Sequence, residues 1–145
     1  MTAIEMESAV HKVVDSYNRK ELSVIDELYD RGFVYHGNGE TANLTREDWR
    51  QFISEMLKAF PDMHIHVDDI FTAGDKLCYR MTISGTNSGD LMGLPPTNKK
   101  ISIRTIGVMR FRDGKVVEEW ENYDELGMLR QLGVIENSLG PRSRL

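Results

Sequence analysis

Hydrophobic residues recur at helical spacing in the first 60 residues of the chain and at strand spacing after them. Between Met6 and Tyr17 the apolar side chains fall mostly three or four residues apart, which makes one stripe along a helix. The widest stripe follows Thr45, which forms a capping-box pattern with Asp48, and it ends at Pro61. This half of the chain predicts helices at residues 3–18, 23–29 and 45–60, with a short strand at 33–36.

After Pro61 the pattern changes to the alternation of half-buried strands. Gly74-Asp75 and Asp113-Gly114 separate apolar runs, and such pairs indicate hairpin turns because glycine readily takes a positive φ. Strands are predicted at residues 64–71, 76–86, 101–112 and 115–123. Helices followed by an antiparallel sheet give an α+β fold with the helices on one face of the sheet. A sheet that curls around these helices encloses a cone-shaped pocket.

The loop at residues 85–100 is 16 residues long and rich in glycine, proline and asparagine. Loops of this length inside a compact domain are often functional, for example as a lid over a binding site. We expect one domain over residues 1–135, because the sequence contains no repeats or linkers. Residues 136–145 carry few apolar side chains and are expected to form a tail that is flexible or used in a subunit contact.

Charge and composition narrow the expected partners and compartment. The formal net charge of −5 argues against nucleic acid and against an anionic membrane as partners, since both favour a basic surface. No run approaches the ~20 apolar residues of a membrane span, and the N-terminal residues lack a signal-peptide core. The single cysteine, Cys78, cannot form an internal disulfide, which fits a reducing compartment. We therefore expect a soluble cytoplasmic protein.

Motifs that bind metals or nucleotides are missing from the sequence. It contains no HExxH, CxxC, GxxxxGK[ST], GxGxxG or GxSxG pattern. His64, His66 and Asp68 share one strand face, but three ligands on a single strand suit facial metal coordination poorly. We expect neither a metal nor a cofactor, which leaves proton-transfer chemistry as the remaining class.

The segment at residues 111–133 combines a hairpin turn, a strand and a short helix, and Asp124 lies where the strand gives way to the helix. Alternation along the strand places Trp120 and Asn122 on the same face as Asp124. Asp124 therefore has two interpretations. It is either a base inside a pocket or the N-cap of the helix that follows.

Alternation assigns faces to other residues as well. The odd-numbered residues of 101–111 form the core face of their strand, which puts Arg104 on the opposite face unless a bulge near Gly107 switches the alternation. Glu119 and Glu121 fall opposite Asp124, where they fit the polar rim of a subunit contact. The further side chains that a curled sheet and three helices could gather around a ligand are His36, Tyr35, Trp49, Asn87, Arg104, Trp120 and Asn122.

Three strings cover residues 59–133: AFPDMHIHVDDIFTAGDKL, SGTNSGDLMGLPPTNKKI and RFRDGKVVEEWENYDELGMLRQLG. In order and spacing they resemble the SnoaL-like polyketide cyclases, a family of the nuclear-transport-factor-2-like superfamily. The resemblance implies a cone-shaped, curved antiparallel sheet wrapped around three N-terminal helices. It also implies a homodimer or small homo-oligomer formed through the outer face of the sheet.

The resemblance further implies a cofactor-free intramolecular aldol ring closure on a hydrophobic, aromatic polyketide ester. The aspartate that acts as general acid/base in the W-x-x-x-D segment of that family corresponds to Asp124, counted from Trp120. A proton on carbon flanked by two carbonyls is acidic enough for a carboxylate in a dry pocket. With the resemblance, we predict Asp124 as the catalytic base.

The sequence departs from the family pattern at two places. The family usually carries a histidine after the Gly-Thr pair, where this chain has Asn87, and another on the strand before the hairpin, where residues 107–110 contain none. Asparagine forms hydrogen bonds but transfers no proton near neutral pH. The departure favours, as an alternative, a non-catalytic binding protein for small hydrophobic ligands. A ketosteroid-isomerase-like enzyme, or an epoxide hydrolase that uses Asp124 with Arg104, are further alternatives.

Overall fold

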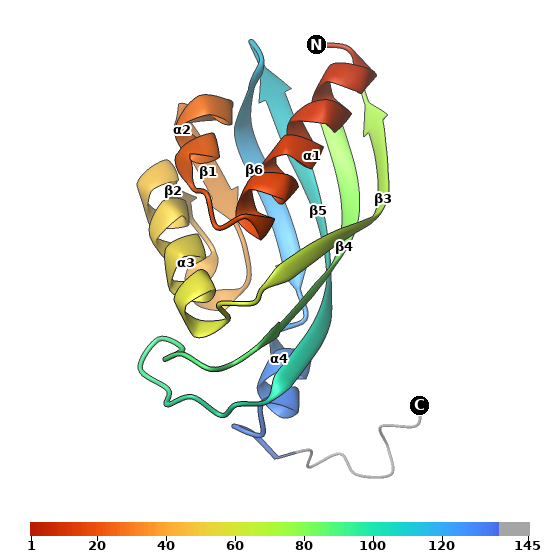
Figure 1. The fold of residues 1–145 in the computed structure, drawn as a ribbon. Coiled ribbons are helices and arrows are strands. Elements are labelled where there is room, and N and C mark those ends of the chain that lie inside the picture. Colours follow the sequence, from red (N-terminus) through yellow and green to blue (C-terminus); the bar gives the residue numbers. More distant parts are fainter. Residues whose placement is uncertain (137–145) are drawn as a thin grey trace.

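The first 60 residues form three helices and two strands, and four further strands and a fourth helix follow (Figure 1). The computed structural model describes residues 1–136, so the expected tail at 136–145 lies almost entirely outside the described residues. The helices are α1 (Ala3–Asn18), α2 (Ser23–Leu28), α3 (Arg46–Ala59) and α4 (Glu125–Gln131), with a short 3-10 turn at Gly39–Thr41. The strands are β1 (Tyr29–His36), β2 (Leu44–Thr45), β3 (His64–Ala73), β4 (Lys76–Thr86), β5 (Lys100–Arg112) and β6 (Lys115–Tyr123).

Capping boxes fix the starts of the two long helices. The Thr2 side chain accepts a hydrogen bond from the Glu5 amide, and the Glu5 carboxylate accepts one from the Thr2 amide. Thr45 and Asp48 form the same reciprocal pair at the start of α3, as the sequence predicts. Each box satisfies backbone N–H groups that a helix start leaves without partners. Within residues 1–136, none of the helices is long and apolar enough to cross a bilayer.

The sheet has the strand order β2-β1-β6-β5-β4-β3. From β3 to β6 each strand pairs antiparallel with the next, which confirms the two predicted hairpins. β1 pairs parallel with β6, whereas the sequence pattern predicts an antiparallel sheet throughout. No tight turn joins β1 to β6, so their relative direction is not fixed by a hairpin.

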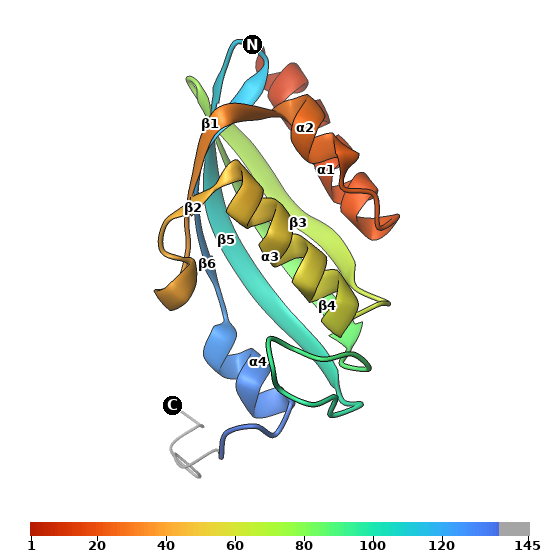
Figure 2. The ribbon, with the colours of Figure 1, turned by 90° about the vertical axis from the view of Figure 1, so that its left-hand side faces the viewer.

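The sheet bends along its length, and α1 and α3 lie on its concave face (Figure 2). α1 contacts β3 and α3 contacts β1, so the two helices cover opposite halves of the sheet. α4 follows the end of β6 and contacts β5 (Figure 1). The predicted α+β fold, with helices inside the curve of the sheet, is confirmed.

Alternation along β5 assigns the two faces of the sheet. The odd-numbered residues 101–111 are buried on the concave face, whereas Ile106 on the convex face is 51% exposed. The predicted core face of this strand is therefore confirmed, and the alternation does not switch at Gly107. Arg104 is exposed on the convex face.

A β-bulge at Val117 reverses the alternation of β6. Glu118 and Val116 pair with adjacent residues of β5, so Val117 is one residue extra on its strand. Val116 and Val117 are both buried, which breaks the in–out pattern at this point. Beyond the bulge, Glu119 and Glu121 face the concave side of the sheet.

Candidate active site

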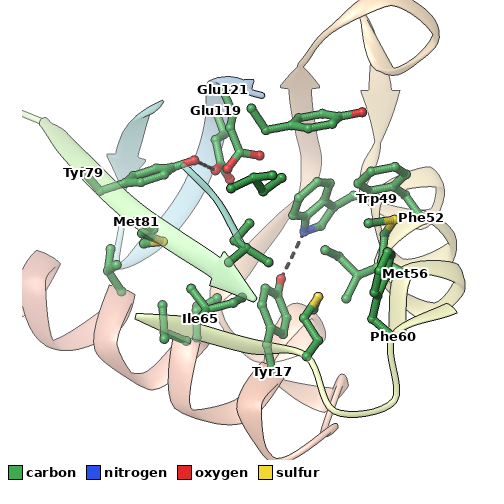
Figure 3. A pocket seen from close by; sticks show the side chains of 18 of the residues that line it. Tyr17, Trp49, Phe52, Met56, Phe60, Ile65, Tyr79, Met81, Glu119 and Glu121 are labelled. Atoms are coloured by element: carbon green, nitrogen blue, oxygen red, sulfur yellow. Dashed lines mark hydrogen bonds between the residues drawn. The ribbon is translucent and has the colours of Figure 1, made fainter. Parts of the chain in front are cut away.

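A cavity lies between the concave face of the sheet and helices α1 and α3 (Figure 3). Its walls are almost entirely apolar, with Val10 and Val14 from α1, Ile53 and Met56 from α3, and Met81 from β4. The space between the walls is about 850 Å³, including the part that is open to solvent. Apolar cavities with a few fixed polar groups are typical sites for small organic ligands.

Two carboxyl groups project into this apolar space from β6. Glu119 is 2% exposed, and the Tyr79 hydroxyl donates a hydrogen bond of 2.5 Å to its Oε2. The other oxygen of Glu119, Oε1, has no hydrogen-bond partner among the described residues. Glu121 is half-buried, and its two oxygens accept hydrogen bonds of 2.7 Å from the hydroxyls of Tyr35 and Thr105. The two carboxyl groups therefore differ in burial and in hydrogen bonding.

Burial and charge together shift the pKa of Glu119. Burial raises the pKa of Glu119 well above its ordinary value of 4.5, and the negative charge of Glu121 raises it further. The hydrogen bond from Tyr79 lowers the pKa of Glu119 by less. Burial and the neighbouring charge of Glu121 therefore favour the protonated form of Glu119. A neutral and an ionised carboxyl group in one pocket can serve as acid and base.

Three aromatic side chains at the cavity form a chain of hydrogen bonds. Trp49 Nε1 donates to the Tyr17 hydroxyl at 3.1 Å (Figure 3), and the Tyr17 and Tyr29 hydroxyls lie 3.4 Å apart. Burial raises the pKa of both Tyr17 and Tyr29 above the ordinary value of 10.0. Both tyrosines therefore stay neutral and keep hydroxyl protons that they can donate.

Two of the predicted pocket side chains belong to this site. Trp49 lines the cavity. Tyr35 is buried, stacks on Trp49 with ring centroids 4.3 Å apart, and donates its hydroxyl to Glu121. Tyr35 thus acts on the cavity through the Glu121 carboxylate that it holds in place.

The structure places Asp124 outside the cavity lining, at the N-cap of α4. Its exposed carboxylate accepts a hydrogen bond of 2.9 Å from the Gly127 amide. Trp120, 37% exposed, and Asn122, also exposed, do not line the cavity either. The predicted inward face of Trp120, Asn122 and Asp124 is therefore wrong, because beyond the bulge at Val117 it is Glu119 and Glu121 that face the cavity. The catalytic role that the resemblance implies for Asp124 stays a prediction, and this position does not support it.

His36 and Arg104 also lie away from the cavity. The His36 ring stacks on Trp120 at a centroid distance of 5.4 Å, and its Nε2 lies 2.7 Å from Glu118 Oε2. Arg110 donates to the other oxygen of Glu118 at 3.1 Å. The hydrogen bonds from His36 and Arg110 hold the pKa of Glu118 below its usual value. His36, Glu118 and Arg110 thus form a hydrogen-bonded cluster on the convex face instead of a ligand site.

Asn87 is 1% exposed, yet its side chain holds the loop at residues 85–100 and does not line the cavity. Its amide nitrogen donates to the carbonyls of Gly89 at 2.8 Å and Ala59 at 3.3 Å. Its amide oxygen accepts from the backbone N–H of Thr97 at 3.0 Å and from the Thr97 hydroxyl at 2.9 Å. These four bonds use the two donors and two acceptor positions of the side chain, so Asn87 fastens the loop to the end of α3.

The histidines and acidic residues assemble no metal centre within residues 1–136, where no group of three or more potential ligands is found. His66 and Asp68 form one pair, 3.0 Å apart, on the exposed side of β3. Cys78 is a half-buried free thiol.

Glu119 and Glu121 are the site residues that the sequence pattern assigns wrongly, since it predicts them on the outer rim of the sheet. The signal that could have placed them is the pair Val116-Val117, two adjacent apolar residues in an otherwise alternating strand. With the register shifted by one residue at this pair, Glu119, Glu121 and Tyr123 fall on the cavity face.

The sequence as a whole matches known proteins. The profile of the SnoaL-like polyketide cyclases matches residues 7–132. Nogalonic acid methyl ester cyclase of Streptomyces nogalater is 38% identical over 53 residues, which cover 37% of this chain and 40% of that enzyme. Aklanonic acid methyl ester cyclase DnrD of Streptomyces peucetius is 25% identical over 127 residues, which cover 86% of this chain and 88% of the relative.

Solved structures share the fold along nearly the whole chain. AclR of Streptomyces galilaeus, named as a candidate hydroxylase, is 29% identical with a TM-score of 0.85, over 94% of this chain and 89% of that protein. IdmH of Streptomyces antibioticus, named as a candidate polyketide cyclase, is 30% identical with a TM-score of 0.77, over 88% of this chain and 97% of its own. The profile match, the curated relatives and the fold agree, and the chain belongs to the SnoaL-like polyketide cyclase family.

Proposed function

We propose that this protein catalyses an intramolecular aldol ring closure on an aromatic polyketide methyl ester, with Glu121 as base and Glu119 as acid. The observation that carries the proposal is the pair of carboxyl groups in one apolar cavity, of which the deeply buried Glu119 is the one whose pKa is raised. The names of the two curated relatives, which refer to nogalonic acid and aklanonic acid methyl esters, support the substrate class. At 25% identity over most of the chain, these names suggest a class of ester and do not specify one compound.

The proposed reaction moves one proton from carbon to oxygen. The Glu121 carboxylate removes the proton from a carbon that lies between an ester and a ketone carbonyl, and the electron pair delocalises as an enolate. The enolate carbon attacks a second ketone carbon of the same molecule, which forms the new C–C bond and leaves an alkoxide. The neutral Glu119 carboxyl then gives its proton to that alkoxide, and the proton held by Glu121 returns to Glu119 before the next turnover. The product is an isomer of the substrate, so no oxidant, reductant or further reactant enters the balance.

The apolar walls contribute in two ways to this chemistry. They exclude most water, which strengthens hydrogen bonds and charge interactions inside the cavity. They also hold the two reacting ends of a folded polyketide together, which turns ring closure into a well-oriented unimolecular step. Acid–base assistance of this kind is typically worth ~10²–10⁴-fold in rate.

The alternatives from the sequence receive less support. The non-catalytic alternative rests on Asn87 in place of a histidine, but the Asn87 side chain binds the loop and does not line the cavity. The epoxide hydrolase alternative needs Asp124 and Arg104 to grip one water molecule. Both side chains are exposed and absent from the cavity lining.

A conversion assay tests the proposed function. Purified protein is incubated with aklanonic acid methyl ester. The products are separated by chromatography, and their masses are measured by mass spectrometry. The expected product has the mass of the substrate and a different retention time, and Glu121→Gln abolishes its formation. Glu118→Gln is the matched control, because Glu118 lies on the same strand with its side chain on the convex face, and it should convert the ester like the wild type. Absence of any isomeric product from this ester and from nogalonic acid methyl ester would contradict the proposal.

We also propose that the protein forms a homodimer through the convex face of the sheet. Ile106, Trp120 and Val34 are 51%, 37% and 36% exposed there, which is unusual for large apolar side chains on one sheet face. The nearby Glu118 carboxylate contacts both His36 Nε2 and the Arg110 guanidinium within the chain, so its burial in a contact leaves it paired. Sedimentation equilibrium of the wild type and of Trp120→Glu tests this, with a dimer converted to monomer as the expected result and a wild-type monomer as the contradicting one.

A further inference from the structure

Two pairs of side chains at the cavity each have one O–H proton more than the single hydrogen bond between them can use. The first pair is Tyr17 and Tyr29, whose hydroxyls lie 3.4 Å apart and can form one hydrogen bond with each other. The indole N–H of Trp49 is only a donor and already points at the Tyr17 oxygen. Whichever tyrosine donates to the other, one phenol proton of the pair has no acceptor among the hydrogen bonds of the described residues.

The second pair is Glu119 and Tyr79. One hydrogen bond of 2.5 Å joins them, and Glu119 Oε1 has no partner. None of the ion pairs within residues 1–136 includes Glu119, so no cation supports a negative charge on it. With Glu119 neutral, the pair has two O–H protons and one shared bond. One proton is again left without an acceptor, whichever group donates.

The rest of the cavity offers few acceptors for these two protons. The Glu121 oxygens already accept from Tyr35 and Thr105, and most other lining side chains are hydrocarbon, aromatic or thioether groups. Figure 3 shows that Tyr79 and Tyr17 approach the cavity from different walls. A ligand with its own hydrogen-bond acceptor can therefore pair with the protons that the protein leaves unpaired. In a buried site, an unpaired O–H group costs free energy.

We propose that the Tyr17–Tyr29 and Glu119–Tyr79 pairs make the cavity a site for a ligand that places a ketone carbonyl oxygen, which is only a hydrogen-bond acceptor, against the two pairs. The proposal deepens the proposed function and rests on it for the identity of the natural ketone, which is the electrophilic ketone of the ring closure. That ketone points inward to the two pairs and accepts their protons, and it becomes the oxygen that Glu119 protonates. The two unpaired protons thus determine the orientation of the substrate, with its ketone oxygen toward the two pairs.

The two pairs determine whether such a site prefers a ketone or a hydrocarbon of the same shape. A carbonyl oxygen has two lone pairs and can accept from both hydroxyl pairs at once. A hydrocarbon of the same shape accepts no hydrogen bond and leaves both protons unpaired. The site should therefore prefer ketone over hydrocarbon, although a ketone loses more hydration when it leaves water.

Binding of 9-fluorenone and fluorene tests the inference, because the two flat molecules differ only in the carbonyl group. Dissociation constants are measured by calorimetry or fluorescence, and the carbonyl stretching band of bound 9-fluorenone is recorded by infrared difference spectroscopy. The wild type should bind 9-fluorenone at least as tightly as fluorene, with the carbonyl band shifted to lower wavenumber than in hexane. A band at the hexane position, tighter binding of fluorene, or no binding of 9-fluorenone would each overturn the inference.

The double variant Glu119→Leu/Tyr79→Phe removes one pair together with its unpaired proton. Because both partners are replaced by apolar groups of similar shape, little stability should be lost, and thermal unfolding checks that the variant folds. We expect the dissociation constant of 9-fluorenone to rise about tenfold, as for the loss of one or two hydrogen bonds, while that of fluorene changes little. An equal change for both ligands would overturn the role of this pair, and Tyr17→Phe/Tyr29→Phe gives the same comparison for the other.

These measurements need no turnover, so the inference and the proposed function can fail separately. A shifted carbonyl band in a protein that converts no ester would leave the carbonyl site standing and remove the cyclase activity. Ester conversion with an unshifted band would keep the activity and remove the carbonyl site.

Discussion

The Tyr79 hydroxyl reaches Glu119 across the backbone of the strand between them, over a position that has no side chain. Tyr79 on β4 pairs with Gly107 on β5, which pairs with Glu121 on β6. A Cβ atom at position 107 would lie 2.3 Å from the Tyr79 hydroxyl oxygen and 2.7 Å from the Trp120 carbonyl oxygen. The glycine thus leaves room for the ring, and the ring delivers its hydroxyl to the buried carboxyl at 2.5 Å.

Gly107→Ala should displace the Tyr79 ring and break its hydrogen bond to Glu119. We expect a loss of about 1–3 kcal/mol in the free energy of unfolding, measured with urea, because the new methyl group overpacks the core. In a Tyr79→Leu background, where the side chain ends earlier, the same substitution should cost less. An equal cost in both backgrounds would mean that the ring does not set the constraint at position 107.

The neutral Glu119 carboxyl predicts a decline of stability with rising pH. Its pKa is raised in the folded protein, so the folded state holds a proton that the unfolded chain releases above its ordinary pKa of about 4.5. The stabilisation is complete below that pH and is lost as the pH rises toward the folded pKa, by up to about 1.4 kcal/mol per pH unit. Urea unfolding at several pH values should show this slope for the wild type and not for Glu119→Gln.

Glu118 is a control of opposite sign for that pH series. Its pKa is lowered in the folded protein by hydrogen bonds from His36 and Arg110, so its stabilisation is present above its ordinary pKa of 4.5 and is lost as the pH falls through the folded value. Glu118→Gln should therefore lower stability at neutral pH, remove the change of stability with pH on the acid side, and leave the slope near neutral pH unchanged. A neutral-pH slope that persists in Glu119→Gln would contradict the assignment of the buried proton to Glu119.

Asp124 is expected to matter for α4 more than for turnover. Its side chain accepts from the Gly127 amide at 2.9 Å, and replacement of an N-cap aspartate by alanine typically costs about 1 kcal/mol of stability. Asp124→Ala should lose about that amount in urea unfolding, whereas Asp124→Asn should keep most of it because asparagine caps equally well. Equal stabilities of the two variants would contradict the capping role.

Asn87→His should destabilise the protein and should not raise turnover. A histidine ring cannot replace all four hydrogen bonds that the Asn87 amide makes with Ala59, Gly89 and Thr97. We expect a loss of about 2–3 kcal/mol, since several buried groups lose their partners. Thermal unfolding and ester conversion are measured on the same preparation. A histidine variant of normal stability and higher turnover would return this position to the active site.

The helices and most strands follow from the sequence because their patterns are local. The stripe from Met6 to Tyr17 and the capping pair Thr45 and Asp48 gave helix bounds within one or two residues of the structure. The Asp113-Gly114 turn was predicted from its type, and both residues have positive φ, 51° and 80°. Parallel pairing of β1 with β6 was not predictable in this way, because it depends on contacts between distant parts of the chain.

The candidate site was harder to predict because it depends on which face of β6 points inward. Counting from Trp120 as an inward residue put Asn122 on the pocket face and Glu119 outside it, but Trp120 lies on the convex face, and only counting from Val116 with the bulge at Val117 included gives the correct face. Trp49 does line the cavity, since the apolar stripe of its helix fixes its direction, and its predicted contact with a ligand stays a prediction. Asn87 was predicted as a ligand contact, but its partners on the loop and on α3 become visible only in three dimensions.

Glu121, and not Asp124, is proposed to remove the carbon-bound proton. Deuterium uptake from D₂O into aklanonic acid methyl ester or a non-cyclising keto-ester of similar shape, followed by mass spectrometry, distinguishes the two residues. Wild type, Glu121→Gln, Asp124→Asn and the control Glu118→Gln are compared at equal concentration. Exchange at the activated carbon is expected in all but Glu121→Gln. Exchange that survives in Glu121→Gln and disappears in Asp124→Asn would contradict this assignment.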